Sequence, residues 1–167
     1  MKLSEHFELD EFIKSPTADK LKISNAPSPE HLANLKNVVE NILEPVRKYF
    51  NKPVKINSGY RGPELNKAVG GAASSQHCNG EAVDFEIDGI PNKTVADWVT
   101  ENLEFDQCIL EFYNPKEGAN SGWVHASYKK GGPNRKQKLI AEKDGSKTVY
   151  KPVTDFDPTN DYNKYKK

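Results

Sequence analysis

The chain has 167 residues, a length that fits one domain with an ordinary hydrophobic core. Its 24 Lys and Arg residues balance its 24 Asp and Glu residues, so no net field draws it to nucleic acid or to an anionic membrane. Because the N-terminus lacks the apolar segment of a secretory signal and no run approaches membrane-spanning length, we expect a soluble monomer made in the cytoplasm.

Helices are predicted in the first third of the chain. A short helix or turn is expected over residues 3–15, where Pro16 ends it. The clearest helix begins after Ser28, a favourable N-cap, and continues with apolar residues spaced three and four apart. Pro45 lies inside this pattern and is expected to kink or restart the helix before Phe50. We interpret this helix as scaffold.

An arginine follows the first predicted strand, over residues 54–56. Gly59 and Gly62 bracket Arg61, which places a cation on a tight loop that leaves the strand. Taken alone, such a residue is most often a surface arginine. A short helix over residues 63–69 and a connection of small residues then lead to the next motif.

That motif contains two good metal-ligand types. His77 and Asp84 are separated by Gly80, which allows the backbone to reverse, and by the start of a strand predicted over residues 81–87. Zinc binds imidazole nitrogen and carboxylate oxygen readily, but a single pair of this kind is weak support for a metal. Cys78 is interpreted as an inert thiol, because a thiolate added to the ligand set would close the site to substrate.

Two further strands bring polar residues toward this motif. The pattern predicts a helix, a strand, an exposed loop and a second strand, over residues 93–103, 106–113, 114–122 and 123–128. The short connection favours antiparallel pairing of the two strands. Alternation would then allow Glu111 and His125 to meet, while Cys108 is expected to be a buried free thiol.

The remaining chain is polar and basic. Residues 136–140 and 148–153 are predicted to pair as a hairpin around Asp144 and Gly145. We expect one domain over residues 1–153 and a polar, flexible tail over residues 154–167, whose lysines form a solvated face.

The decapeptide of residues 75–84 is a more specific signal for a metal site than its two metal-ligand residue types alone. Ser75, His77, Gly80, Ala82 and Asp84 match S-x-H-x-x-G-x-A-x-D at every fixed position. The chain resembles the zinc D-alanyl-D-alanine carboxypeptidases and the related L-alanyl-D-glutamate endopeptidases of phage lysins, over roughly residues 3–128. The resemblance implies an α+β fold of the hedgehog/DD-peptidase type, with a small antiparallel sheet flanked by helices. It also implies hydrolysis of peptide bonds in bacterial peptidoglycan.

The same resemblance assigns roles to individual residues. His77, Asp84 and His125 match the family's zinc ligands, and Arg61 matches an arginine that holds substrate near the metal. Many members carry an acid three residues before the last histidine, where this chain has Gly122. The form with I-x-E followed by W-V-H fits better, which makes Glu111 the candidate general base ahead of the other carboxylates.

Substrate contacts and delivery are less defined. Ser75 and Trp123 are candidate substrate-binding residues, and Ser75 could equally support its own loop. The expected partner is the peptidoglycan stem peptide, reached after phage-type release or delivery. The alternative is a non-catalytic, zinc-containing wall-binding or virion structural module of the same fold. The residues do not distinguish a carboxypeptidase from an endopeptidase.

Overall fold

A six-stranded sheet forms the centre of the protein, with strands in the order β1-β2-β4-β3-β5-β6. This computed structural model describes residues 1–165. The strands are β1 (Lys55–Ser58), β2 (Ala82–Glu86), β3 (Gln107–Glu111), β4 (Trp123–Ser127), β5 (Gln137–Asp144) and β6 (Lys147–Pro152). The α+β class is confirmed, whereas the hedgehog-like arrangement stays a prediction.

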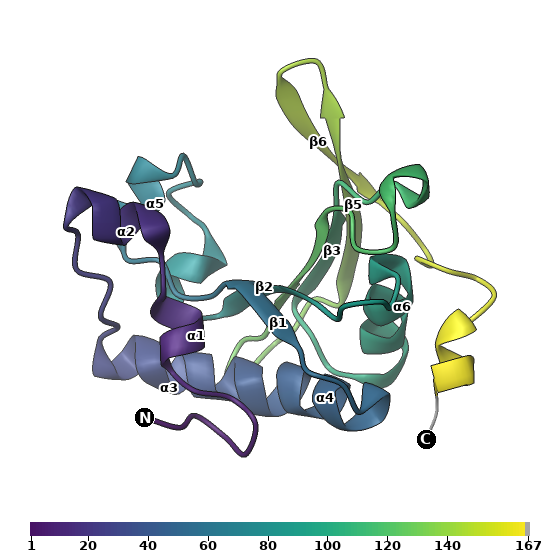
Figure 1. The fold of residues 1–167 in the computed structure, drawn as a ribbon, viewed down its shortest axis with the longest axis horizontal. Helices are drawn as coiled ribbons and strands as arrows, with labels where there is room; N and C mark the ends of the chain where they lie inside the picture. Colours follow the sequence, from purple (N-terminus) through teal and green to yellow (C-terminus); the bar gives the residue numbers. More distant parts are fainter. Residues whose placement is uncertain (166–167) are drawn as a thin grey trace.

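The sheet is mixed, so the prediction of an antiparallel sheet is wrong for one pairing. The strands β3 and β5 run parallel, with Ile109 opposite Leu139, while the other neighbouring pairs are antiparallel. After β4 the chain crosses the end of the sheet and returns along the free edge of β3. Because β3 and β5 both run opposite to β4, they run in the same direction. The predicted hairpin around Asp144 and Gly145 is confirmed as β5–β6, which projects beyond the helices in Figure 1.

The two faces of the sheet differ in chemistry. One face carries apolar side chains that belong to the main core, namely Val83, Phe85, Leu110, Val124 and Ala126. The helices α3 (Pro29–Val38), α4 (Glu44–Phe50) and α6 (Asn92–Asn102) contribute to that same core and lie along the sheet in Figure 1. Alternation therefore sends Asp84, His125 and Glu111 to the opposite face, which these helices leave uncovered.

Pro45 has the predicted effect on the long helix. A five-residue π-helical turn, Val39–Leu43, separates α3 from α4, and Pro45 lies at the start of α4. Proline lacks an amide hydrogen and its ring crowds the carbonyl four residues earlier, so regular helical bonding is interrupted there. Ser28 caps α3 as predicted, accepting a hydrogen bond from the His31 amide at 3.1 Å.

Short helices complete the fold at the ends of the sheet and the chain. These are α1 (Asp10–Ile13), α2 (Pro16–Leu21), α5 (Pro63–Ala68) and the 3-10 turns η2 (Gln76–Asn79), η3 (Pro115–Glu117) and η4 (Asp161–Tyr165). Within residues 1–165, none of the helices combines the length and apolar character that crossing a membrane requires.

The segment after Val153 contributes aromatic side chains to the main core. Phe156 is 9% exposed and joins the main core, and Tyr162 and Tyr165 pack against it. The Tyr49 hydroxyl also donates a hydrogen bond to the Tyr162 carbonyl at 3.0 Å. Three aromatic residues of this polar segment thus pack on the core, while the division into a domain over residues 1–153 and a flexible tail over residues 154–167 stays a prediction. Residues 166 and 167 lie outside the described part of the chain.

Candidate metal and active site

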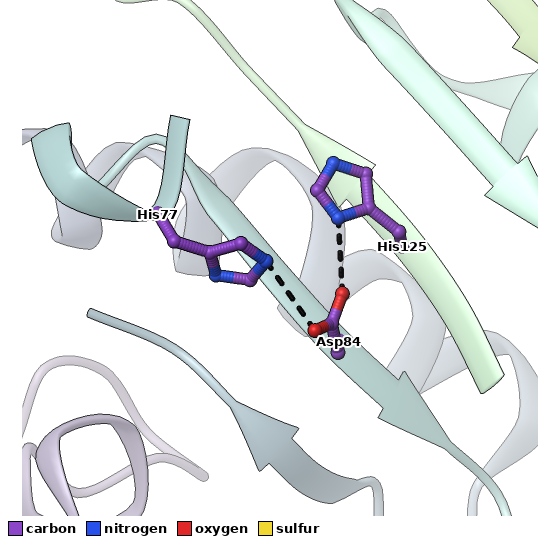
Figure 2. A group of neighbouring side chains, drawn as sticks. All are labelled: His77, Asp84 and His125. Carbon is purple, nitrogen blue, oxygen red and sulfur yellow. Dashed lines mark hydrogen bonds and ion pairs between the residues drawn. The ribbon is translucent and has the colours of Figure 1, made fainter. Parts of the chain in front are cut away.

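Three side chains from different elements converge on the open face of the sheet. His77 projects from η2, Asp84 from β2 and His125 from β4, as Figure 2 shows. Asp84 and His125 are directly opposite in the β2–β4 register. The two carboxylate oxygens of Asp84 divide between the histidines, with Oδ2 3.3 Å from His77 Nε2 and Oδ1 3.0 Å from His125 Nδ1.

The turn that carries His77 is held in place at both ends. At its start, Ser75 Oγ accepts a hydrogen bond from the His77 amide. At its end, Gly80 has φ +75°, and a Cβ there would lie 2.4 Å from the His31 carbonyl oxygen. Only glycine satisfies both the left-handed backbone and this close approach. The glycine turn of the motif therefore has a steric cause.

The His77 ring is oriented by the backbone. Its Nδ1 lies 2.7 Å from the Gly59 carbonyl oxygen, which can only accept a hydrogen bond. Nδ1 therefore carries a proton, and Nε2 is the nitrogen that faces Asp84 and is available to a metal. A backbone carbonyl that fixes the tautomer in this way is the usual support of a histidine ligand.

The electrostatics keep Asp84 ionised. Burial on its own would raise the pKa of the Asp84 carboxyl, but the charges and hydrogen bonds of His77 and His125 outweigh burial and hold that pKa well below its usual range. A deprotonated carboxylate is the form that binds a metal.

These three residues fit a zinc ion. One donor atom from each lies within 4.8 Å of the others, and all three residues are buried. A set of two imidazole nitrogens and one carboxylate oxygen suits zinc and leaves a coordination position for water or substrate. Cys78 is not part of this group; it is a free thiol whose pKa is raised by burial, as expected of an inert cysteine. Cys108 is likewise free and fully buried.

Glu111 lies beside this group, as strand alternation predicts. Its Oε2 is 3.9 Å from His125 Nδ1 and accepts a hydrogen bond from Trp123 Nε1 at 2.7 Å. Burial raises the pKa of the Glu111 carboxyl, and the nearby charge of Asp84 raises it further. The indole hydrogen bond fixes the Glu111 carboxylate, and the oxygen that it holds, Oε2, is also the one that lies near His125.

Gly122 explains why the acid cannot precede His125 by three residues in this chain. The residue has φ +66°, and a Cβ there would lie 1.9 Å from the Glu111 carbonyl oxygen. A side chain at position 122 would therefore collide with the strand that carries Glu111. The glycine at position 122, where many family members have an acid, therefore lies directly against the backbone of Glu111, the residue that supplies the acid in this chain.

A cavity of about 670 Å³ opens over these residues, a size typical of ligand sites. Arg61 lines it, and its buried Nε has no hydrogen-bond partner within residues 1–165. Ser75 Oγ accepts from Arg61 Nη2 at 3.4 Å, in addition to its bond from the His77 amide. These contacts match the loop-supporting role considered for Ser75, while substrate binding by Ser75 and Trp123 stays a prediction.

The far wall of the cavity was not predicted. Arg135, Leu139 and Tyr150 line it, and they come from β5, β6 and the connection before them. The basic character of this region favours the interpretation of a solvated face, and no local pattern signals that β5 pairs with β3. The long-range parallel pairing alone brings these residues to the site.

Asp106 connects this wall to the turn that carries His77. It is fully buried and accepts hydrogen bonds from the Gln76 side chain and from three groups of Arg135, the backbone amide, Nε and Nη2, at 2.8–3.1 Å. Burial would raise the pKa of the Asp106 carboxyl, but the Arg135 bonds outweigh it and lower this pKa to about 2, from an ordinary value of 3.8.

We expect Asp106→Asn to lower the free energy of unfolding by about 2 kcal/mol at pH 7, because a buried charged acceptor is lost. The lowered pKa means that the wild type retains this stabilisation above about pH 4 and loses it progressively as the pH falls toward 2. Urea unfolding at a series of pH values measures both effects. Glu104→Gln, which removes an exposed ion pair with Lys136, serves as the control and should change stability by less than about 0.5 kcal/mol. A difference between wild type and Asp106→Asn that stays constant from pH 7 to pH 2.5 would contradict this assignment.

The geometry is that of a candidate metal-dependent hydrolase, and comparison of the sequence with protein families agrees. The model of the peptidase M15 family matches residues 5–125. The chain therefore belongs to the peptidase M15 family, which confirms the resemblance to the zinc D-alanyl-D-alanine carboxypeptidases and implies a zinc-dependent peptidase. The match includes His77, Asp84 and His125, which we call the His-Asp-His group, and it ends before β5. A comparison with curated proteins gave no significant match.

Proposed function

We propose that this protein hydrolyses peptide bonds in the stem peptide of bacterial peptidoglycan, with a zinc ion held by His77, Asp84 and His125. The observation that carries the proposal is the convergence of three metal-donor atoms within 4.8 Å, with the Glu111 carboxylate 3.9 Å from one of them. Membership of the peptidase M15 family supports the reaction class. The decapeptide resemblance supports peptidoglycan as the substrate.

The ligands have separate tasks in this proposal. His77 contributes Nε2, since Nδ1 is held by the Gly59 carbonyl, and Asp84 contributes a carboxylate that is ionised throughout the neutral range. When bound, zinc supplies Lewis acidity and makes water a nucleophile near neutral pH. Asp84 also positions the two imidazoles relative to each other, because each of its carboxylate oxygens contacts one of them.

Glu111 moves the protons. Its carboxylate, oriented by the Trp123 indole, accepts a proton from the attacking water and then gives that proton to the leaving amine nitrogen. The carbon–nitrogen bond of the amide breaks, and a carboxylate and an amine are formed. A raised pKa suits both steps, because a base works best when its pKa approaches the working pH.

Arg61 recognises the negative oxygen of the substrate. Arg61 lines the same cavity as the ligands, and its buried Nε has no hydrogen-bond partner within residues 1–165. A guanidinium can donate two parallel hydrogen bonds to a carboxylate or to a developing oxyanion. Removing a single donor of this kind from an oxyanion site lowers kcat by about 10²–10³-fold.

Digestion of purified peptidoglycan by the zinc-loaded protein tests the proposal. We expect new free amino groups to appear, because amide bonds are cut, without an increase in sugar reducing ends. Zinc content is measured on the same sample. Binding of the zinc-loaded protein to the wall without release of amino groups would contradict the proposal and favour the non-catalytic wall-binding module.

A further inference from the structure

A second group of carboxylates lies where α6 meets the segment that follows β6. Asp97 and Glu101 are four residues apart, on one face of α6. Asp155 comes from the C-terminal segment, which runs beside α6 in Figure 1. One oxygen from each of the three side chains lies within 4.8 Å of the others. Acidic side chains from two distant parts of the sequence are thus held together.

Asp97 is the unusual member of this group. It is 1% exposed, and neither of its carboxylate oxygens has a hydrogen-bond partner within residues 1–165. Buried carboxylates in proteins are normally paired or hydrogen-bonded, because removing the charge from water is costly. Exposed acids are common on protein surfaces, but a buried acid aimed at two other acids requires an additional explanation.

Among the residues that the structure describes, the charged neighbours that act on Asp97 are other carboxylates, those of Glu101, Asp155 and Asp157. Asp157 is a further buried acid on the same segment, and the nearest cation recorded for it is Lys93, whose Nζ is 4.0 Å from Oδ2. Burial, and after it the neighbouring charge of Glu101, raise the pKa of the Asp97 carboxyl to about 6. At neutral pH the group therefore calls for either a proton or a bound cation.

We propose that Asp97, Glu101 and Asp155 bind a calcium ion that fastens the C-terminal segment to α6. Two oxygens bound to one calcium ion at about 2.4 Å each can be at most about 4.8 Å apart, and the three oxygens of this group lie within that distance of one another. The donors are all oxygen, as calcium prefers, and no imidazole or thiol belongs to the group to favour zinc. Glu101 and Asp155 are exposed, so water can complete the flexible coordination of calcium more readily than the strict octahedron of magnesium.

The ion would act on stability and not on chemistry. Phe156, which follows Asp155, is buried in the main core, and Tyr162 packs edge-on against Tyr49. Tyr49 stacks in turn on Trp98 of α6. Calcium would therefore strengthen a contact already made by aromatic side chains, on the face of the sheet opposite the His-Asp-His group. The proposal does not depend on the proposed peptidase activity.

Calorimetric titration and thermal unfolding test this site in the zinc-loaded protein after exhaustive dialysis against calcium-free and magnesium-free buffer. We expect one calcium ion per chain. We also expect the unfolding temperature to rise by roughly 5–10 °C at a calcium concentration about 100 times the Kd. Magnesium at the same concentration should give a smaller rise.

Variants locate the binding. Asp97→Asn should weaken calcium binding at least about tenfold and abolish the temperature shift, while being at least as stable as the wild type without calcium. Asp155→Asn changes an exposed residue and should weaken binding without a risk to folding. Asp88→Asn, an exposed acid on the turn after β2, is the matched control and should retain the full shift. Absence of binding at millimolar calcium, or wild-type affinity in Asp97→Asn, would overturn the proposal.

Discussion

Replacing Glu111 with glutamine is expected to lower kcat on peptidoglycan by about 10²–10⁴-fold, the usual contribution of a general base. The glutamine has nearly the same shape and can still accept the hydrogen bond from Trp123 Nε1. It cannot take a proton from water, however, so the chemical step is lost while the fold is kept. Because Glu111 is not among the three converging donors, the zinc content of the variant should equal that of the wild type.

A matched change elsewhere separates this effect from a general loss of charge. Glu117→Gln alters an exposed acid in η3, outside the cavity, and should leave kcat unchanged. Both variants are assayed by the release of amino groups, with zinc measured in parallel. Activity of Glu111→Gln within about threefold of the wild type would show that another group takes the proton.

Replacing His125 with alanine is expected to abolish both zinc retention and activity. The change removes one of three donors and leaves Asp84 buried with a single histidine. Loss of a supporting group outside a ligand set already weakens metal binding by about 10–100-fold, so loss of a ligand should exceed that range. Zinc content after dialysis and the affinity from competition with a chromophoric chelator measure the effect.

His31→Ala is the control for the loss of a histidine. His31 is half-buried on the first turn of α3, its ring lies 3.3 Å from the Tyr60 hydroxyl, and it is not among the converging donors. The variant should keep one zinc ion per chain and full activity. Retention of zinc at wild-type affinity in His125→Ala would exclude His125 from the ligand set.

The candidate site was predictable where it depends on local patterns. The decapeptide places His77 and Asp84 around a tight turn, and strand alternation brings Glu111 and His125 to one face. The structure adds the reason why glycine is required at two positions. A Cβ at Gly80 would collide with the His31 carbonyl oxygen, and a Cβ at Gly122 would collide with the Glu111 carbonyl oxygen. Those contacts join residues distant in sequence, so glycine patterns alone do not reveal them.

The other wall of the cavity and the position of the C-terminal segment depend on long-range contacts, which local patterns in a single sequence do not predict. The parallel contact between β3 and β5 changes the class of the sheet and brings Arg135 and Tyr150 into the cavity wall. Likewise, the acids of the C-terminal segment are typical of a solvated tail until Phe156 is seen to hold the segment against α6. In both regions a few contacts override a composition that is polar overall.

Mass spectrometry of the products from defined muropeptides tests the central claim most directly. The zinc-loaded wild type should release fragments whose masses correspond to hydrolysis of one stem-peptide amide, with the disaccharide intact. Loss of a single terminal alanine would mark a carboxypeptidase, and division of the stem would mark an endopeptidase. The zinc-free protein and Glu111→Gln should release neither. Unchanged muropeptides after incubation with zinc-loaded wild type, or cleavage within the disaccharide, would contradict the account.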